Sequence, residues 1–211
     1  GAFNLHGSLL PAYRGRCPVN WVLINGETQT GVTLHYMVRR ADAGDIVGQK
    51  IVPIMPDDTA LILYGKLCDA ASLLLDELLP LLKNGQAPRI PQLLSHGSYY
   101  GGRRPEDGRI EWSWTAVRIF NLIRAVTDPY PGAFCKMPTG SRLWIWWGMP
   151  VASDDAETGD PVGFVKVHKD RILVRTGQGW LRLFDVQIHD ERMSGDRLLR
   201  LFKSQEGMIL S

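Results

Sequence analysis

The sequence predicts an α/β layer followed by a small β-barrel, and three observations support this prediction. Short apolar runs alternate with helical patterns in the first part of the chain, which is typical of an α/β layer. The composition then changes over residues 86–108, where prolines, glycines and arginines gather as in a linker. Beyond this stretch, short strand-like runs follow at the close spacing of a barrel of the oligonucleotide-binding type. We therefore expect one domain over residues 1–105 and a second over residues 106–211.

The first domain begins with a strand and a short helix. Residues 2–6 form a short apolar strand candidate. A helix can start at Pro18, because proline is favoured in the first helical turn, and Gly26 suits the C-terminal cap. Residues 31–38 and 46–54 are rich in β-branched side chains and predict two further strands. A polar loop joins these two strands.

A single long helix is expected over residues 57–85. Its apolar positions recur with the 3.6-residue period of an amphipathic helix, and N-cap residues precede them. Pro80 should kink this helix and Gly85 should end it. The N-cap candidates and the apolar stripe are, in chain order, Asp57, Asp58, Thr59, Leu63, Leu67, Ala71, Leu74 and Leu78.

The second domain is expected to be mostly β-structure. A helix is predicted near residues 114–126, before a Pro-Tyr-Pro-Gly turn at 129–132. A short helix near 195–203 closes the chain. Between the turn and that helix, strands are predicted at residues 133–137, 142–147, 162–167, 171–176 and 180–188.

Composition places the chain among ordinary globular proteins and disfavours several functions. Of its 211 residues, 45% are hydrophobic and 22% are charged. No apolar run approaches the roughly 18 residues that a membrane-spanning helix needs. The 24 Lys and Arg nearly balance the 22 Asp and Glu, without the basic stripe that would bind nucleic-acid phosphates. We therefore expect neither a membrane nor a nucleic-acid partner.

The cysteines point to a reducing compartment. Cys17, Cys68 and Cys135 are widely spaced and form no CxxC pair. This spacing argues against a disulfide framework and against a zinc site. None of the five His residues shows the spacing of metal ligands either. We expect a cytoplasmic protein that needs no metal.

Two polar residues lie in the first strand. Asn4 and His6 are two apart, so on a strand they project to the same side, while Phe3 and Leu5 project to the other. A strand inside a parallel sheet is covered on both faces and is normally apolar throughout. Asn4 and His6 are therefore either hydrogen-bonded groups of the core or groups that reach a cleft at the strand's carboxyl end, where open α/β sheets bind ligands.

Two loops could complete a site with this strand. Residues 8–16 form a long polar loop directly after it, where a substrate could bind. Asp42 and Asp45 lie in the loop between the next two strands, with small residues around them. Aspartates in such loops often serve only as turn formers, so the residues alone leave a catalytic and a structural interpretation open.

The stretch "FNLHGSLLPAYRGRCPVNWVLINGETQTGVTLHYMVRRADAGDIVGQ" closely resembles the folate-dependent formyltransferases. The specific signals are Asn-x-His, the Ser-Leu-Leu-Pro-x-Tyr-Arg-Gly loop, and the Asp of "ADAGDI" at the expected distance. The resemblance extends through "RAVTDPYPGAF", typical of the family's smaller C-terminal domain, and so covers nearly the whole chain. Within the family, "YRGRCPVNWVLINGETQTGVTLH" is most similar to the transformylase part of the bifunctional UDP-4-amino-4-deoxy-L-arabinose enzyme of lipid A modification.

The resemblance implies a fold and a reaction. The fold would be the C-terminal part of a Rossmann-like sheet followed by the small barrel domain. The reaction would transfer a formyl group from N10-formyltetrahydrofolate to the amine of a nucleotide-linked 4-amino sugar. Asn4 and His6 would bind the oxygen on which negative charge develops, and Asp42 would hold the tautomer of His6 and accept the amine proton.

The resemblance also assigns the binding residues. Those implied for the folate are Ser8, Leu9, Leu10, Pro11, Ala41 and Asp45. Those implied for the sugar nucleotide are Tyr13, Arg14, Gly15, Arg16, Arg103 and Arg104. The planar forks of Arg103 and Arg104 suit a diphosphate, although these two residues fit a solvated linker equally well.

Two other functions remain open at this stage. One is the formylation of methionyl-tRNA, which the balanced charge disfavours. The other is a non-catalytic folate- or nucleotide-binding module, because family members carry most of a Rossmann-like sheet before the Asn-x-His strand. From this difference, and from the lack of an initiator Met, we expect an upstream segment of the same protein to take part in the site.

Two further groups of residues are expected to have structural roles. His35 alternates along a strand and is interpreted as a packing or hydrogen-bonded residue. Trp144, Trp146 and Trp147 could stack on bases, as on oligonucleotide-binding barrels. No basic cluster surrounds them, so a place in the strand core or at a subdomain interface is favoured.

Overall fold

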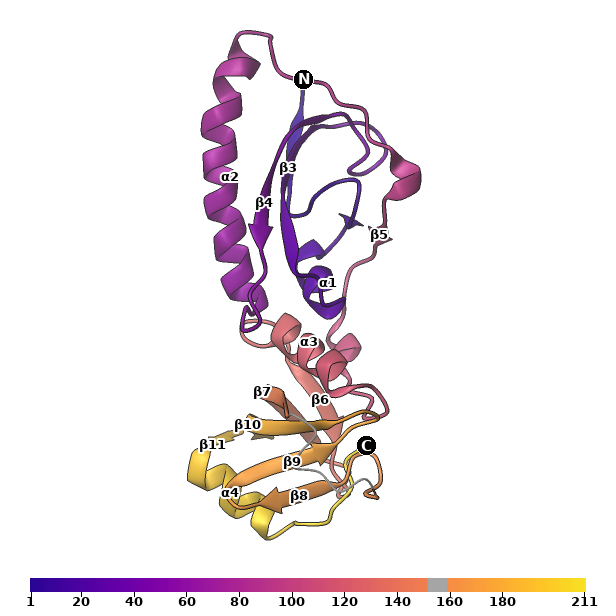
Figure 1. The fold of residues 1–211 in the computed structure, drawn as a ribbon, viewed down its shortest axis with the longest axis vertical. Helices are drawn as coiled ribbons and strands as arrows, with labels where there is room; N and C mark the ends of the chain where they lie inside the picture. The colour runs from indigo at the N-terminus through magenta and orange to yellow at the C-terminus, as the bar shows by residue number, and fades with distance from the viewer. Residues whose placement is uncertain (152–158) are drawn as a thin grey trace. The chain divides into compact units, whose positions relative to one another are not determined.

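The computed structural model describes residues 1–151 and 159–211, which form two compact units. The first unit is Gly1–Arg103 and the second is Arg104–Ser211 (Figure 1). The division falls inside the stretch 86–108 that the sequence marks as a change of composition.

The first unit is built on a three-stranded antiparallel sheet. Its strands β1 (Phe3–His6), β3 (Gln29–Tyr36) and β4 (Ile46–Pro53) lie in the order β1-β3-β4. Strand β1 pairs antiparallel to β3, so its neighbour among the described residues is not the parallel strand considered for it on sequence. A chain that passes through a helix between two strands usually returns parallel. Here the return places Phe3 opposite Tyr36 and His6 opposite Thr33.

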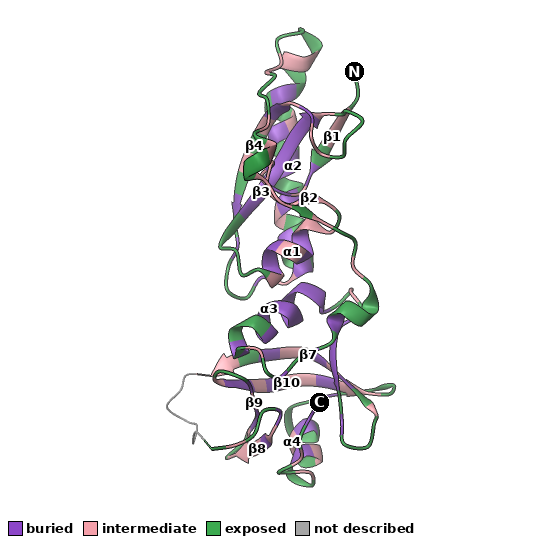
Figure 2. Cartoon of the chain, turned by 90° about the vertical axis from the view of Figure 1, so that its right-hand side faces the viewer, coloured by how far each residue is buried: buried purple, intermediate pink, exposed green. Residues whose placement is uncertain are grey.

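Two helices accompany this sheet, as predicted. The first, α1 (Pro18–Ile24), begins at Pro18 and is followed by Gly26 in the left-handed conformation. The second, α2 (Ala60–Lys83), starts after Thr59, whose side chain accepts a hydrogen bond from the Ile62 N–H (3.3 Å). Helix α2 lies along one face of the sheet (Figure 1) and turns a buried stripe toward it (Figure 2).

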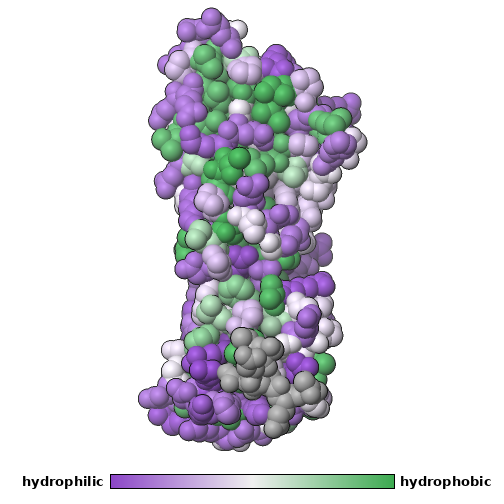
Figure 3. Space-filling model, in the orientation of Figure 1, coloured by the Kyte–Doolittle hydropathy of each residue, from purple (hydrophilic) through white to green (hydrophobic). Residues whose placement is uncertain are grey.

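The end of α2 differs in one respect from the expectation. The helix continues without interruption through Pro80 to Lys83, and Gly85 follows with φ 70°. Pro80 lies in the last turn, and because it has no N–H it cannot donate to the Asp76 carbonyl, so one helical hydrogen bond is missing there. The outer face of α2 is not wholly polar, and hydrophobic residues are visible on the surface of this unit (Figure 3). The exposed ones on α2 are Leu61, Ile62, Tyr64, Leu73 and Leu79.

The residues after α2 are more ordered than a simple linker. A 3₁₀ turn, η1 (Leu94–His96), precedes the short strand β5 (Tyr99–Tyr100). Strand β5 pairs in parallel with β2 (Arg14–Gly15), which lies in the loop after β1. Sequence reasoning missed both short strands because two-residue elements leave no periodic pattern.

The second unit is an antiparallel β-structure with two helices, α3 (Ala116–Val126) and α4 (Gly195–Lys203), after a short 3₁₀ turn, η2 (Pro105–Gly108). The five predicted strands and both helices are confirmed, and one further strand forms a hairpin with β10. The sheet order is β6-β7-β10-β9-β8, with β11 on β10. The strands are β6 (Ala133–Lys136), β7 (Arg142–Val151), β8 (Val165–His168), β9 (Arg171–Arg175), β10 (Trp180–Ile188) and β11 (Glu191–Ser194).

The last residues of the chain connect the two edges of this sheet. The Leu210 N–H donates to the Gly163 carbonyl (2.9 Å), and the Val165 N–H donates to the Met208 carbonyl (2.9 Å), next to β8. Ser211 exchanges two backbone hydrogen bonds with Lys136 at the end of β6 (2.6 and 3.0 Å). The C-terminal segment thereby bridges β8 and β6, the two ends of the strand order, and closes the sheet into a barrel there.

The tryptophans of β7 pack against arginines on the outside of the barrel. Trp144 and Trp146 are half-buried, whereas Leu143 and Ile145 between them are fully buried. Arg142 lies over the Trp144 ring and Arg192 lies over the Trp146 ring, with 5.3 and 4.9 Å to the ring centroids. These rings are therefore held in side-chain contacts of the barrel itself.

Candidate active site

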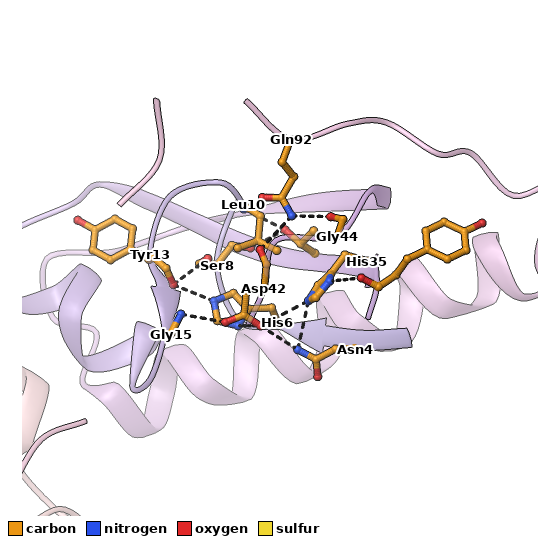
Figure 4. A network of polar contacts seen from close by, with 12 residues as sticks. Asn4, His6, Ser8, Leu10, Tyr13, Gly15, His35, Asp42, Gly44 and Gln92 are labelled. Carbon is orange, nitrogen blue, oxygen red and sulfur yellow. Dashed lines mark hydrogen bonds and ion pairs between the residues drawn. The ribbon is translucent and has the colours of Figure 1, made fainter. Parts of the chain in front are cut away.

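Asp42 lies at the centre of a cluster of polar side chains on the first unit (Figure 4). It belongs to the loop between β3 and β4 and has a left-handed backbone, with φ 52°. One carboxylate oxygen, Oδ2, accepts a hydrogen bond from the Gly15 N–H (2.9 Å). The other, Oδ1, faces β1 and β3. The loop therefore presents a carboxylate whose two oxygens have different partners.

Asn4 and His6 project from β1 toward this carboxylate, on the same side of the strand as predicted. The Asn4 amide nitrogen donates to Asp42 Oδ1 at 3.3 Å. His6 Nδ1 lies 3.7 Å from the same oxygen, and its ring is almost fully buried. The three residues expected to be catalytic are thus brought together by a strand and a loop that are far apart in sequence.

His35 is a fourth member of the cluster: it is buried and hydrogen-bonded, as expected, but the sequence did not indicate that it lies beside Asp42. Its Nε2 lies 3.5 Å from Asp42 Oδ1 and 3.3 Å from the Asn4 amide nitrogen. His35 stands directly opposite Asn4 in the antiparallel pairing of β1 and β3. Knowledge of that pairing would have revealed it, since residues opposite each other in a sheet lie close together.

Backbone carbonyls determine which ring nitrogens carry hydrogens. His6 Nε2 is 2.8 Å from the Tyr13 carbonyl oxygen, and His35 Nδ1 is 2.9 Å from the Tyr36 carbonyl oxygen. A carbonyl can only accept, so both of these nitrogens are donors. In neutral His6 the remaining nitrogen, Nδ1, is therefore unprotonated and faces Asp42. The Tyr13 carbonyl, rather than Asp42 as expected, fixes the His6 tautomer.

The loop after β1 is tied to the sheet by buried hydrogen bonds. The Ser8 hydroxyl donates to the Ala12 carbonyl (2.7 Å), so it serves the loop itself. The Thr33 hydroxyl donates to the Ser8 carbonyl (2.6 Å) and accepts from the Leu10 N–H (3.1 Å). The Leu10–Pro11 peptide bond is cis. Leu9 lines a pocket of about 180 Å³ together with Tyr13.

Tyr13 belongs to an aromatic cluster at the far end of this loop. The Tyr13 ring stacks on the Tyr100 ring with 5.0 Å between centroids. The Trp21 ring packs against the same Tyr100 ring, also with 5.0 Å between centroids. The Tyr13 hydroxyl donates to Glu27 (2.6 Å). Burial raises the pKa of the Tyr13 hydroxyl, and the hydrogen bond to Glu27 raises this pKa further. The hydroxyl therefore stays protonated and keeps its donor role at neutral pH.

The arginines of the expected substrate region differ in their surroundings. Arg14 is 5% exposed, and within the described residues its Nε and Nη1 have no hydrogen-bond partner. Arg16 is exposed, and its N–H donates to the Tyr100 carbonyl (3.0 Å). Arg103 lies over the Trp21 ring, 4.7 Å from its centroid. Arg104 belongs to the second unit, where its N–H donates to the Asp107 carboxylate (2.7 Å).

The other two expected folate-binding residues flank Asp42. Ala41 is exposed, and Asp45 forms a partly exposed ion pair with Arg89 (3.3 Å). Gln92, which the sequence interpretation left within the linker, contacts the same loop through its side-chain amide. The only sequence signal for Gln92 would have been a polar residue in an otherwise apolar and proline-rich stretch.

The surroundings of His6 are mostly apolar. A pocket of about 150 Å³ reaches its ring and is otherwise lined mainly by side chains of β1, β3 and the two helices, including Leu5, Val19 and Leu67. Across residues 1–151 and 159–211, no group of three or more His, Cys, Asp or Glu is arranged to hold a metal ion. In the same residues no helix combines the length and apolarity required to cross a bilayer.

Fold and site together define a class of two-unit proteins in which an α/β unit holds an Asn–His–Asp cluster and a β-barrel unit follows. Family comparison then identifies the family. The formyl transferase model matches residues 1–79, and the model of the formyl transferase C-terminal domain matches residues 103–203. The two matches together cover most of the chain, which therefore belongs to the formyltransferase family.

Solved structures show the same fold at low sequence identity. HypX from Aquifex aeolicus in complex with tetrahydrofolic acid matches with a TM-score of 0.67 and 20% identity over 97% of this chain. WlaRD, a sugar 3N-formyl transferase whose structure was determined with dTDP and 5-N-formyl-THF, matches with a TM-score of 0.68 and 22% sequence identity over 90% of this chain. The N-formyltransferase from Helicobacter canadensis, in complex with folinic acid and dTDP-3-aminofucose, matches with a TM-score of 0.67 and 24% sequence identity over 89% of this chain.

These relatives are longer than the present chain. The match spans 36% of the HypX chain, 65% of WlaRD and 66% of the H. canadensis enzyme. The likeness accordingly concerns the fold of the shared part.

Proposed function

We propose that this chain transfers the formyl group of N10-formyltetrahydrofolate to the amine of a nucleotide-linked amino sugar, with Asn4, His6 and Asp42 as catalytic residues. The observation that carries this proposal is the convergence of these three side chains around Asp42 Oδ1. Membership of the formyltransferase family supports the reaction type. Two structural relatives that were solved with a folate and a dTDP compound support the class of substrate.

The residues present fit a formyl donor of the folate type. When bound, N10-formyltetrahydrofolate supplies an activated formyl carbon that an amine can attack. The chain must then stabilise negative charge on the formyl oxygen and move one proton from the amine toward the departing nitrogen. An amide donor and an imidazole, each within 4 Å of the same carboxylate oxygen, suit these tasks. The chemistry does not require a covalent nucleophile from the protein.

Asn4 is suited to bind the formyl oxygen. Its amide nitrogen contacts Asp42 and His35, both at 3.3 Å, which is near the long limit of a hydrogen bond. One of these weak bonds can be exchanged for a stronger one to an oxygen that gains negative charge. In this role Asn4 stabilises the transition state more than the ground state, as catalysis requires.

His6 and Asp42 are suited to move the proton. The Tyr13 carbonyl keeps the hydrogen of neutral His6 on Nε2, so Nδ1 can take up the amine proton directly or through a water molecule. The Asp42 carboxylate, 3.7 Å from Nδ1, stabilises the imidazolium that results. The proton then passes to the departing nitrogen. Neither residue gains or loses a proton over the complete reaction.

The loops around the cluster would hold the two substrates. We assign Ser8, Leu9, Leu10, Pro11, Ala41 and Asp45 to the folate side, where Ser8 acts by shaping its loop. On the sugar-nucleotide side, the Tyr13–Tyr100–Trp21 cluster offers aromatic surface, and Arg14, Arg16 and Arg103 offer positive charge. Gly15 contributes its N–H to Asp42, and Arg104 is proposed as a further phosphate contact. The particular substrate we propose is UDP-4-amino-4-deoxy-L-arabinose, on the sequence resemblance described above.

The first prediction concerns formyl transfer itself. The purified chain, and a version of it extended upstream, are each mixed with N10-formyltetrahydrofolate and UDP-4-amino-4-deoxy-L-arabinose, and the formamido sugar is followed by mass spectrometry. Asn4→Ala, His6→Ala and Asp42→Asn should each lower kcat by about 100-fold or more, because each removes a transition-state contact or the proton path. Asp57→Asn, an exposed change of the same kind, should leave the rate unaltered.

Other outcomes would redirect the proposal. Activity that survives all three substitutions would remove the catalytic assignment. Formylation of dTDP-3-aminofucose, but not of the UDP sugar, would keep the reaction and change the substrate. Formylation of methionyl-tRNA alone would replace the substrate class, and folate binding without turnover of any amine would indicate a binding module.

A further inference from the structure

Gln92 clamps the loop that carries Asp42. Its side-chain amide nitrogen donates to the Asp42 carbonyl (3.0 Å) and to the Gly44 carbonyl (2.6 Å), as Figure 4 shows. An amide NH₂ has two hydrogens, so both are used on one loop. Carbonyls two residues apart that are bound to the same nitrogen cannot rotate independently. Gln92 therefore restricts the backbone on both sides of residue 43.

Asp42 needs such a restraint because its backbone conformation is an unfavourable one. A φ of 52° is left-handed, a region that Asp enters more readily than most residues with a side chain but that is still less favourable for its backbone than the right-handed one. The direction of the carboxylate depends on this conformation. A change in φ or ψ at Asp42 would move Oδ1 away from Asn4 and His6 and Oδ2 away from the Gly15 N–H.

The segment that carries Gln92 also holds the other loop of the site. We call residues 90–100 the crossing segment. Ile90 forms a two-hydrogen-bond bridge with Ile46 at the start of β4 (2.8 and 3.0 Å). The Ser98 hydroxyl accepts from the Tyr13 N–H (2.8 Å), and β5 pairs with β2 beside Gly15. The crossing segment thus fixes both the backbone of Asp42 and the Gly15 N–H that binds its carboxylate.

We propose that Gln92 is a positioning residue for the Asp42 carboxylate, and that the crossing segment is a working part of the site rather than a linker. This inference rests on the proposed function for its kinetic consequences. Its structural consequence, the direction of the Asp42 carboxylate, is independent of which reaction the site performs. A residue that only satisfied two loop carbonyls would affect stability and leave the carboxylate in place.

The test compares Gln92→Met with Gln86→Met. Methionine keeps the length of the side chain and removes both donors, and Gln86 is an exposed glutamine outside the site. Gln92→Met should lower kcat for formyl transfer by about 10- to 100-fold, as expected when a catalytic group is misplaced by about 1 Å. KM for the sugar nucleotide should stay within about twofold, because the loop of residues 8–16 keeps its own contacts. Gln86→Met should behave as the wild type.

A second measurement does not depend on activity. The Gly15 amide signal in a ¹⁵N–¹H spectrum reports its hydrogen bond to Asp42, and the ring ¹⁵N shifts of His6 and His35 report the carboxylate beside them. These signals should change in Gln92→Met and in Gln92→Glu, and stay unchanged in Gln86→Met. If neither the wild-type chain nor its upstream-extended form formylates an amine, the proposed function fails, and this spectrum alone decides the role of Gln92.

Two results would overturn the inference. One is a Gln92→Met protein whose Gly15, His6 and His35 signals match those of the wild type. The other is a loss of activity that follows only a lower melting temperature, with unchanged pH dependence of kcat/KM and unchanged signals. Either result would show that Gln92 only stabilises the loop and does not position the Asp42 carboxylate.

Discussion

At the scale of single residues, Asp42 and its neighbours show how much of a site depends on backbone groups. Its carboxylate is held by the Gly15 N–H, and its own carbonyl is held by Gln92. The His6 tautomer is set by the Tyr13 carbonyl. None of these contacts follows from residue type, because every residue except proline has an N–H and every residue has a carbonyl. The side chains could be found from the sequence, and the groups that orient them could not.

His35 illustrates a different limit. On sequence it is one histidine in a β-rich run, and a packing role is the reasonable interpretation. Only the antiparallel register of β1 and β3 places it opposite Asn4 and within 3.5 Å of Asp42. Its Nε2 can accept from the Asn4 amide because its Nδ1 donates to the Tyr36 carbonyl. His35 thus helps to orient Asn4 as well as lying beside Asp42.

A prediction at this scale concerns Arg14. Its guanidinium is 5% exposed, and two of its nitrogens lack partners in the part of the chain that the structure describes. A buried charge without a counter-charge is unfavourable, and replacing such a group by an apolar one of similar size is often neutral or stabilising. Arg14→Met should therefore raise the free energy of unfolding, by about 1 kcal/mol or more. It should weaken UDP binding at least tenfold if Arg14 contacts the diphosphate.

Urea denaturation and calorimetric titration measure these two effects separately. For the unfolding measurement alone, Arg16→Met is the matched control, because Arg16 is exposed and its removal should change the free energy of unfolding by no more than about 0.5 kcal/mol. A destabilised Arg14→Met protein that still binds UDP normally would show that Arg14 has a structural role, stabilising the fold through contacts other than hydrogen bonds at its Nε and Nη1.

At the scale of elements, the loop after β1 packs closely against the paired strands β3 and β4. Gly31 of β3 lies against the Lys50 carbonyl of β4 and against Leu9 of the loop after β1. A Cβ at position 31 would lie 2.3 Å from that carbonyl oxygen and 2.5 Å from Leu9 Cδ2. These distances are far below contact distance, so the absence of a side chain at this position lets the loop approach the sheet.

The prediction that follows compares two glycines. Gly31→Ala should lower the free energy of unfolding by about 1–3 kcal/mol, because the strand or the loop must move to admit a methyl group. Gly65→Ala, in the middle of α2 with open space around it, should raise the free energy of unfolding by about 0.5–1 kcal/mol, because alanine favours the helix. Chemical denaturation of both variants checks the two signs. Equal effects at the two positions would contradict the close packing of β3, β4 and the loop.

The elements also show which sequence signals are dependable. Helix α2 was predictable because an N-cap, a 3.6-residue stripe and a terminal glycine all agree. The strands of the second unit were predictable from short β-branched and aromatic runs between turn residues. Sheet direction was not predictable, because a strand that could pair either way has the same sequence. The crossing segment escaped detection because its order comes from contacts with distant loops and not from its own pattern.

At the scale of the whole molecule, the chain consists of two compact units with different kinds of secondary structure. The first unit places a polar cluster on a small antiparallel sheet, and both loops of the cluster are tied by the crossing segment. The second unit is a barrel whose strands were largely predictable, whereas the part that the last residues of the chain play in closing it was not. Closure depends on the last five residues, which form no regular strand and give no strand signal in the sequence.

The last prediction concerns this closure. Leu210 is 2% exposed, while its neighbour Ile209 is 49% exposed. Leu210→Ala should lower the free energy of unfolding of the second unit by about 2–5 kcal/mol, the usual effect of truncating a buried leucine. Ile209→Ala, an equal truncation one residue away, should change it by no more than about 0.5 kcal/mol. Deleting residues 208–211 should exceed both effects, since it also removes the backbone bonds to Gly163, Val165 and Lys136.

Tryptophan fluorescence can follow the unfolding of the second unit, because Trp21 is the only one of the seven tryptophans in the first unit. A deletion that leaves the fluorescence transition in place would show that the barrel holds together without its C-terminal segment.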